Sequence, residues 1–215
     1  MPRTLSFLFL LVVSGVLFAA SAYESDKADW PALRLELEVI FGTDQAMRKE
    51  SNTLVSDARS KNVEVDKAVL AGLRKKIAEQ DRVNQRRVAE IVDKHGWPKL
   101  SQVGSLAATT VFLVVQHADL EYQLRYLDRV REAASAGEAS TANFALLEDR
   151  VLLRQGKSQR YGSQVETRGG VSIMPTDDEA NLDARRASAG LAPICEYLER
   201  FVKTHGKVVY PPCVK

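Results

Sequence analysis

The stretch GSLAATTVFLVVQHADLEYQ, residues 104–123, decides the fold. Its first twelve residues are almost all apolar or small, which is typical of a central helix covered on all sides. The run leads directly into the polar segment Gln116–Asp119. His117 follows Leu113 by four positions and precedes Leu120 by three, so it falls on the buried stripe of the helix. We therefore expect polar side chains to line the core of a helical protein.

The residues on both sides of this stretch predict more helices. Apolar residues recur there at helical spacing, and Gly or Pro residues interrupt the pattern between segments. The predicted helices cover residues 30–60, 66–94, 103–134, 141–154, a short segment after Asp178, and 194–204. The predicted fold class is mainly α, a single-domain helical bundle of about five to six helices.

The segment 159–174 is the least helical part of the chain. Val165 on one side, and Val171 and Ile173 on the other, flank the turn residues Gly169 and Gly170. Alternating apolar residues on both sides of a glycine turn are the pattern of a β-hairpin, so a small hairpin is predicted within this segment.

The first residues have the layout of a secretory signal peptide. Arg3 precedes an apolar run from Leu5 to Phe18, and the small residues Ala20–Ala22 match a cleavage site. A transmembrane anchor is the alternative, but the run is short against the about 20 residues that a span needs. We expect residues 1–22 to be a signal peptide and residues 23–215 to be one mature domain. The protein would then be periplasmic or secreted, with no membrane span after cleavage.

Charge and cysteine usage limit the kinds of partner. The formal net charge is +2 with both signs interspersed, whereas a nucleic-acid surface would show a basic cluster, so no nucleic acid is expected. Cys195 and Cys213 are predicted to form a disulfide, because paired cysteines in exported proteins usually do. A metal site lacks neighbouring ligands, and a redox pair would usually show Cys-x-x-Cys spacing. The disulfide would staple the C-terminal tail to the last helix.

Polar residues interrupt the apolar stripes of several predicted helices. Unpaired buried charge is costly, so we expect these interruptions to meet in one pocket between the helices. The candidate catalytic residues are His117, Asp81 and Asp119. The candidate ligand-binding residues are Asp44, Arg48, Asn84, Gln116, Gln123, Asp149, Arg150, Gln159, Tyr161, Gln164 and Arg186. Each could instead be structural, as an ion pair or as part of a hydrogen-bonded network that fixes helix register.

These residue types indicate which chemistry the pocket would support. His117 next to Asp81 or Asp119 would suit acid–base catalysis. Arg48, Arg150 and Gln164 would hold an anionic or amide group. Zinc would need three or four ligands, and one histidine with aspartates is the most that the chain offers. No metal ligands are therefore assigned, and any cofactor is unknown. The chain has no Gly-x-Ser-x-Gly turn and no Gly-x-x-x-x-Gly-Lys loop.

Four segments together resemble a known bacterial family. They are HGWPKLSQVGSLAA (95–108), VVQHADLEYQ (114–123), LLEDRVLLRQGKSQRYGSQ (146–164) and DARRASAGLAPICEY (183–197). They are similar to the family catalogued as domain of unknown function 6624, whose pattern covers roughly residues 33–197. The resemblance implies a mainly helical single domain and no assigned reaction.

Two functions from different classes are consistent with these features. The first is a polar pocket between helices that binds or hydrolyses a small polar or anionic ligand. The second is a periplasmic interaction protein with a protein partner, such as an immunity protein against a delivered toxin. The first predicts a buried polar set and the second predicts exposed functional residues. Whether the protein is an enzyme stays open.

Overall fold

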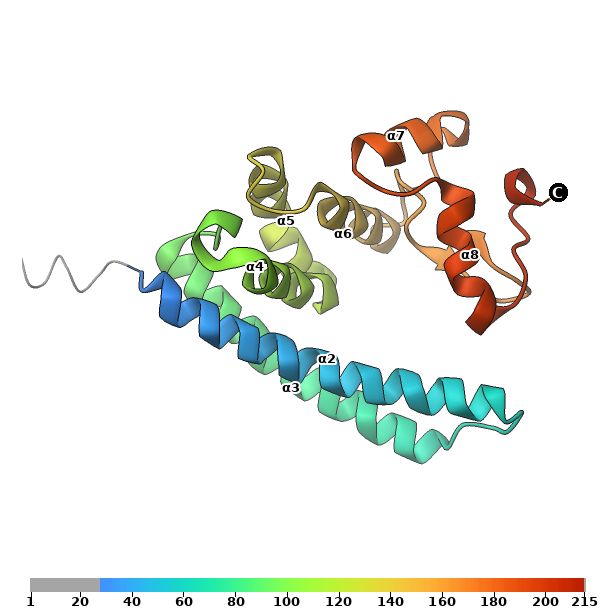
Figure 1. Cartoon of the computed structure of the whole chain (residues 1–215), viewed down its shortest axis with the longest axis horizontal. Helices are drawn as coiled ribbons and strands as arrows, with labels where there is room; N and C mark the ends of the chain where they lie inside the picture. Colours follow the sequence, from blue (N-terminus) through green and yellow to red (C-terminus); the bar gives the residue numbers. More distant parts are fainter. Residues whose placement is uncertain (1–27, 215) are drawn as a thin grey trace, which may run out of the picture.

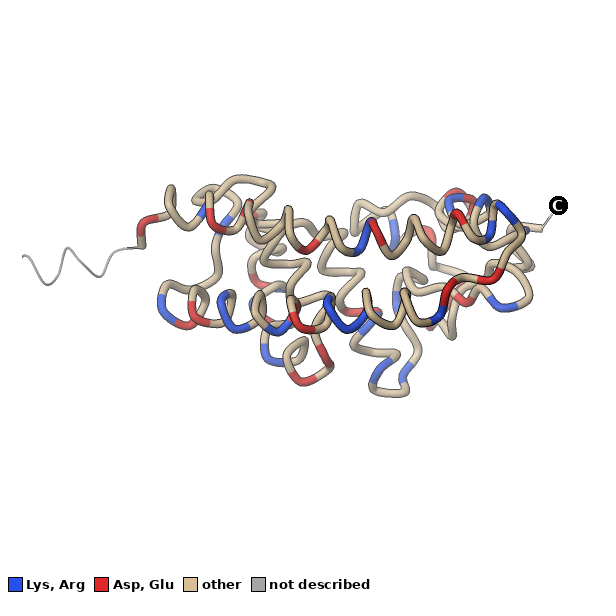
Figure 2. The backbone as a smooth tube through the Cα atoms, turned by 90° about the horizontal axis from the view of Figure 1, so that it is seen from below, with Lys and Arg blue, Asp and Glu red and all other residues tan. Residues whose placement is uncertain are grey.

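A long antiparallel helix pair forms one side of the molecule (Figure 1). The computed structural model describes residues 28–214, so the predicted signal peptide lies outside the described residues. Helix α2 (Trp30–Ser60) and helix α3 (Lys67–His95) make the pair. The carboxylates of Asp29 and Asp66 cap their N-termini. Basic and acidic residues are interspersed along the pair (Figure 2), as expected for a solvated outer face.

Helix α4 (Leu100–His117) packs across this pair and builds the main core. Leu37 of α2, Val88 of α3 and Val111 of α4 are all fully buried in one cluster. The expectation of a helix covered on all sides was wrong, because Leu106 is 41% exposed. Helix α4 therefore has one covered face and one partly open face.

The predicted continuous helix over residues 103–134 is in fact two helices. Helix α4 ends at His117, and helix α5 (Leu120–Ser135) begins after two residues with extended backbone. The carboxylate of Asp119 accepts a hydrogen bond from the Tyr122 N–H at 2.9 Å and so caps α5. Apolar periodicity continues across the break, which is why spacing alone predicted one helix. With this split, residues 28–214 contain seven α-helices instead of the five to six expected.

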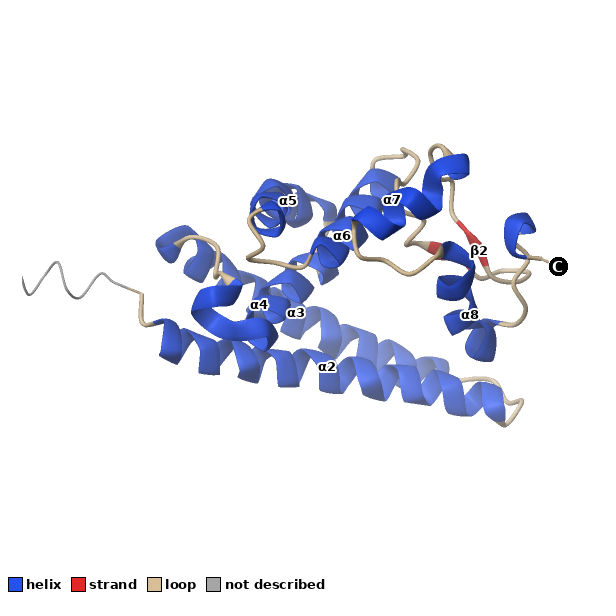
Figure 3. Cartoon of the chain, turned by 45° about the horizontal axis from the view of Figure 1, so that its top comes forward, coloured by secondary structure: helices blue, strands red, loops and turns tan. Residues whose placement is uncertain are grey.

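Helix α6 (Thr141–Arg154) packs against α5 and contributes Leu147 and Val151 to the main core. The chain after α6 forms a smaller unit (Figure 3). Its elements are strands β1 (Val165–Glu166) and β2 (Ser172–Ile173), helices η1 (Glu179–Asn181), α7 (Leu182–Ser188) and α8 (Ile194–His205), and η2 (Pro211–Cys213). The two strands pair antiparallel, which confirms the predicted hairpin. A second apolar cluster joins the hairpin to α7, α8 and the tail. Within residues 28–214, no helix is both long and apolar enough to cross a membrane.

The predicted disulfide joins Cys195 of α8 to Cys213 of the tail, with their Cα atoms 5.3 Å apart. It closes a loop with a sequence separation of 18 residues. Replacing both cysteines with Ser should lower the free energy of unfolding by about 3 kcal/mol, because the unfolded chain regains loop entropy. Urea denaturation would measure this change. Dithiothreitol should destabilise the parent protein by the same amount and leave the variant unchanged, and equal stability of the two proteins would contradict the prediction.

Candidate functional site

Four charged or titratable side chains from three helices meet near the C-terminal end of α4. Asp44 of α2 lies at the centre, with its carboxylate 3.2 Å from Arg48 Nε and 3.3 Å from His117 Nδ1. Arg48 Nη2 also donates to Asp81 of α3 at 2.5 Å. The structure thus brings Asp44, Arg48, Asp81 and His117 together, as the interrupted stripes predicted. We call these four residues the central cluster.

Asp44 is the most buried member of the central cluster, at 4% exposure. Burial raises its pKa, but His117, Arg48 and the side-chain amide of Gln45 together outweigh burial and hold the pKa of Asp44 below its usual value. Asp44 is therefore ionised at neutral pH. If His117 donates its Nδ1 proton to Asp44, Nε2 of the ring is left as a proton acceptor.

The central cluster also contains the residues that could hold a metal ion. Asp44, Asp81 and His117 each offer one ligand atom, and these atoms lie within 4.8 Å of one another. The guanidinium of Arg48 already bridges the two carboxylates. Because this cation neutralises the same two carboxylates that a metal would use, we interpret the group as an ion-paired network around His117.

Arg150 of α6 lies next to Gln116, the residue before His117 on α4. With the Gln116 amide oriented to satisfy both groups, its oxygen accepts from Arg150 Nε at 3.0 Å and Nη2 at 3.2 Å. Arg150 has no carboxylate partner among residues 28–214. Burial lowers the pKa of Arg150, and the positive charges of Arg154 and Arg48 lower it further. Arg150 is thus a partly desolvated cation beside other cations.

The break between α4 and α5 is held by a second set of polar contacts. Gln123 is fully buried, and its Nε2 donates to the Gln116 carbonyl at 2.9 Å. Arg154 Nη1 donates to the Ala118 carbonyl at 2.8 Å and to Gln123 Oε1 at 2.9 Å. These bonds satisfy carbonyl groups that the end of α4 leaves free. Gln123 therefore positions Gln116 and His117 and has no free hydrogen-bonding atom for a ligand.

The comparison with protein-family models gives one match over most of the chain. The model described as a family of unknown function, DUF6624, matches residues 31–209. The chain belongs to the DUF6624 family. No curated protein and no solved structure matches it. Membership confirms the resemblance that the four motif segments predicted, and the mainly helical fold of this DUF6624 chain agrees with it.

Asp149 and Arg150 are adjacent on α6, and their side chains make different contacts. Arg150 faces the central cluster, whereas Asp149 is fully buried against the loop that follows α6. The Asp149 carboxylate accepts from the backbone N–H groups of Arg160 (2.7 Å), Tyr161 (3.0 Å) and Ser163 (2.9 Å). Asp149 shapes the 160–163 loop, and within residues 28–214 its carboxylate makes no hydrogen bond or ion pair with the central cluster.

The Gln-x-Tyr-Gly-x-Gln turn is held by side chains that bond to the backbone. Gln159 Nε2 donates to the Gln164 carbonyl at 3.0 Å, and the Gln164 N–H donates to Gln159 Oε1 at 2.9 Å. Arg186 is 1% exposed and donates to the carbonyls of Tyr161 (2.6 Å) and Ala192 (2.7 Å). These predicted ligand-binding residues are thus used in building the loop.

Two other predicted site residues, Asp119 and Asn84, form hydrogen bonds with residues other than His117. Asp119 is exposed and caps α5, so Asp44 takes the orienting position that was predicted for Asp81 or Asp119. Asn84 is buried and accepts from Gln80 Nε2 at 2.8 Å, and its own Nδ2 has no hydrogen-bond partner. The geometry supports a site at the central cluster with Gln116 and Arg150, which is smaller than the set predicted from sequence.

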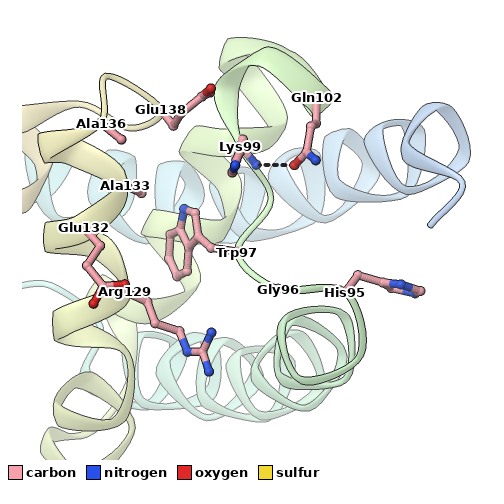
Figure 4. Close-up of a pocket in the computed structure, with 10 residues that line it drawn as sticks. All are labelled: His95, Gly96, Trp97, Lys99, Gln102, Arg129, Glu132, Ala133, Ala136 and Glu138. Atoms are coloured by element: carbon pink, nitrogen blue, oxygen red, sulfur yellow. Dashed lines mark hydrogen bonds between the residues drawn. The ribbon is translucent and has the colours of Figure 1, made fainter. Parts of the chain in front are cut away.

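Two cavities differ in their relation to this site. The larger, of about 950 Å³, lies between α2 and α8, and Gln45 and Arg48 line it. We call it the α2–α8 cleft. The other, of about 430 Å³, lies between Trp97 and the α5 residues Arg129 and Glu132 (Figure 4), and no predicted site residue lines it. The α2–α8 cleft is therefore the one of these two that reaches the central cluster.

Sequence reasoning missed Arg154, which lies beside this site, and Tyr197, which lies against the loop after α6. Arg154 follows Arg150 by four positions, so the two cations share one face of α6, and this spacing was a usable signal. Tyr197 lies on α8 with its ring 4.7 Å from the Arg186 guanidinium, and its hydroxyl bonds to the Ser163 carbonyl. No local pattern marks Tyr197, because only the fold brings α8 next to this loop.

Proposed function

We propose that the protein binds a small anionic ligand between Arg48 and Arg150, and that His117 exchanges a proton with it. The observation that carries this proposal is the environment of Arg150. Its guanidinium is partly buried, bonds only to an amide, and has Arg48 and Arg154 as charged neighbours. Desolvated charge without a counter-ion is unfavourable, and a phosphate or carboxylate would supply the missing negative charge in fork geometry.

His117 supports a chemical role for the same site. Its ring is 20% exposed and is held on one side by the ionised Asp44. An imidazole that is oriented through Nδ1 can accept or donate a proton at Nε2. Hydrolysis would use this arrangement if His117 took a proton from a water molecule as that water attacked the bound ligand.

Several observations favour this function over a protein-interaction role. Asp44 and Gln116 of the candidate site are buried, whereas an interaction protein should expose its functional residues. The disulfide fits a non-cytoplasmic protein. We therefore propose a ligand-binding or hydrolytic protein that is periplasmic or secreted.

Arg150→Met tests the proposal by separating ligand binding from stability. Inorganic phosphate at about 100 times its Kd should stabilise the parent protein by about 2.7 kcal/mol in thermal unfolding. The variant should bind phosphate at least about tenfold more weakly. In phosphate-free buffer, it should unfold within about 1 kcal/mol of the parent, because methionine removes a buried, repelled charge.

Arg87→Gln is the matched control, since Arg87 pairs with Glu36 on the α2–α3 pair, away from the central cluster. It removes one positive charge and should leave phosphate binding unchanged. The proposal is wrong if phosphate does not stabilise the parent protein, or if Arg150→Met binds phosphate as tightly as the parent does. A loss of several kcal/mol in phosphate-free buffer would show instead that Arg150 is structural.

A further inference from the structure

The α2–α8 cleft has an unbalanced charge. It is lined by the cationic side chains of Arg48, Lys49, Arg59, Arg74 and Arg200, together with His205. No Asp or Glu is among the described residues that line it. Positive charge is therefore concentrated in a cavity of about 950 Å³, although the chain as a whole is close to neutral.

Most of these cations are available to a ligand. Within the described part of the chain, Lys49, Arg59 and Arg74 have no carboxylate partner. Arg200 pairs only with the exposed Glu196, at 3.7 Å. Clefts lined by one sign of charge focus the electrostatic potential and raise the local concentration of ligands of opposite charge.

The cleft and the site described above share one residue, Arg48. Arg48 lines the cleft and also bonds to Asp44 and Asp81 in the central cluster. Arg59 follows Arg48 by eleven residues on α2, which is about 16 Å along a helix. A ligand bound at Arg48 would thus need several linked groups to reach Arg59.

We infer that the natural ligand is an elongated polyanion, with one anionic group between Arg48 and Arg150 and further anionic groups along the α2–α8 cleft. This inference rests on the proposed function for the first group. The cleft cations favour long ligands over short ones, because each additional anionic group of the ligand meets an additional unpaired cation. Linear phosphate or carboxylate chains have this chemistry.

Binding of two inorganic probes tests the inference. Orthophosphate and linear hexaphosphate would be titrated into the full chain by calorimetry at about 0.15 M salt, where distant charges are screened. Hexaphosphate should bind at least about tenfold more tightly than orthophosphate. Arg59→Gln/Arg74→Gln should remove most of this difference and leave orthophosphate affinity within about twofold. Arg150→Met should weaken the binding of both probes.

Arg82→Gln/Arg86→Gln is the control, since both residues are exposed on α3, do not line the cleft and carry the same charge. It should change neither affinity by more than about twofold. Three results would overturn the inference: no advantage for hexaphosphate, an advantage that survives Arg59→Gln/Arg74→Gln, or an equal loss in the control. Hexaphosphate binding could also depend on Arg59 and Arg74 but not on Arg150. That result would contradict the proposed function, and it would contradict a ligand that spans the Arg48–Arg150 site and the α2–α8 cleft.

Discussion

Replacing Asp149 with Ala is expected to lower the free energy of unfolding by about 4 kcal/mol. The Asp149 carboxylate is fully buried and accepts hydrogen bonds from the backbone N–H groups of Arg160, Tyr161 and Ser163. Alanine would leave these three donors without their partner and would open a gap below the loop. The measurement is urea denaturation at neutral pH, followed by circular dichroism.

Glu148→Gln is the control for Asp149→Ala, because the two acids are adjacent on α6. Burial, and then the negative charge of Asp149, raise the pKa of Glu148. Its charged form is thus disfavoured, and removing the charge should leave stability equal or slightly higher at pH 7. If Asp149→Ala cost no more than Glu148→Gln, the loop would have to be held by other contacts.

Replacing Asp44 with Asn should lower the free energy of unfolding by about 3 kcal/mol at pH 7. Asparagine leaves Arg48 and His117 without their shared buried carboxylate. The pKa of Asp44 is lower in the folded protein than its unfolded value of 3.8. Its stabilising effect is therefore complete above that value and is lost as the pH falls through the folded pKa. The difference in free energy of unfolding between the two proteins should be full at neutral pH and should shrink only as the pH falls below 3.8 towards the lower folded pKa.

Asp81→Asn provides the comparison, since Asp81 also binds Arg48 but is more exposed than Asp44. We expect it to cost less than half as much as Asp44→Asn, because water can replace its lost charge. A larger loss for Asp81→Asn, or a difference for Asp44→Asn that does not change with pH, would contradict the central position of Asp44.

Much of the fold follows from local patterns in the sequence. Short-range signals set several boundaries in the structure. Two helices start after Asp29 and Asp66, one helix stops at Gly96, and a glycine turn joins the two strands of the hairpin. The break at Asp119 was missed because a helix cap and a helix interior look the same when apolar spacing continues through both. Local chemistry thus predicts an element well when its start and stop signals interrupt the periodicity.

The site was only partly predictable, because partners distant in the sequence are fixed by packing. The polar residues that interrupt the apolar stripes were expected to meet, and four of them do: Asp44, Arg48, Asp81 and His117. The same reasoning placed Asp149 in the pocket, yet its side chain turns to the loop after α6. One polar residue on a buried stripe looks like another until the backbone groups that it satisfies are known.

The most direct test follows the imidazole of His117 by nuclear magnetic resonance while inorganic phosphate is added at constant pH. The chain has three histidines, so His95, which does not line the α2–α8 cleft, serves as an internal reference, and His205, which does, reports on phosphate bound in the cleft. We predict that the ring signals of His117 shift and saturate with phosphate, that Arg150→Met abolishes the shift, and that Arg59→Gln/Arg74→Gln preserves it. Unchanged His117 signals in the parent protein, at phosphate concentrations that shift His205, would contradict an anion site between Arg48 and Arg150.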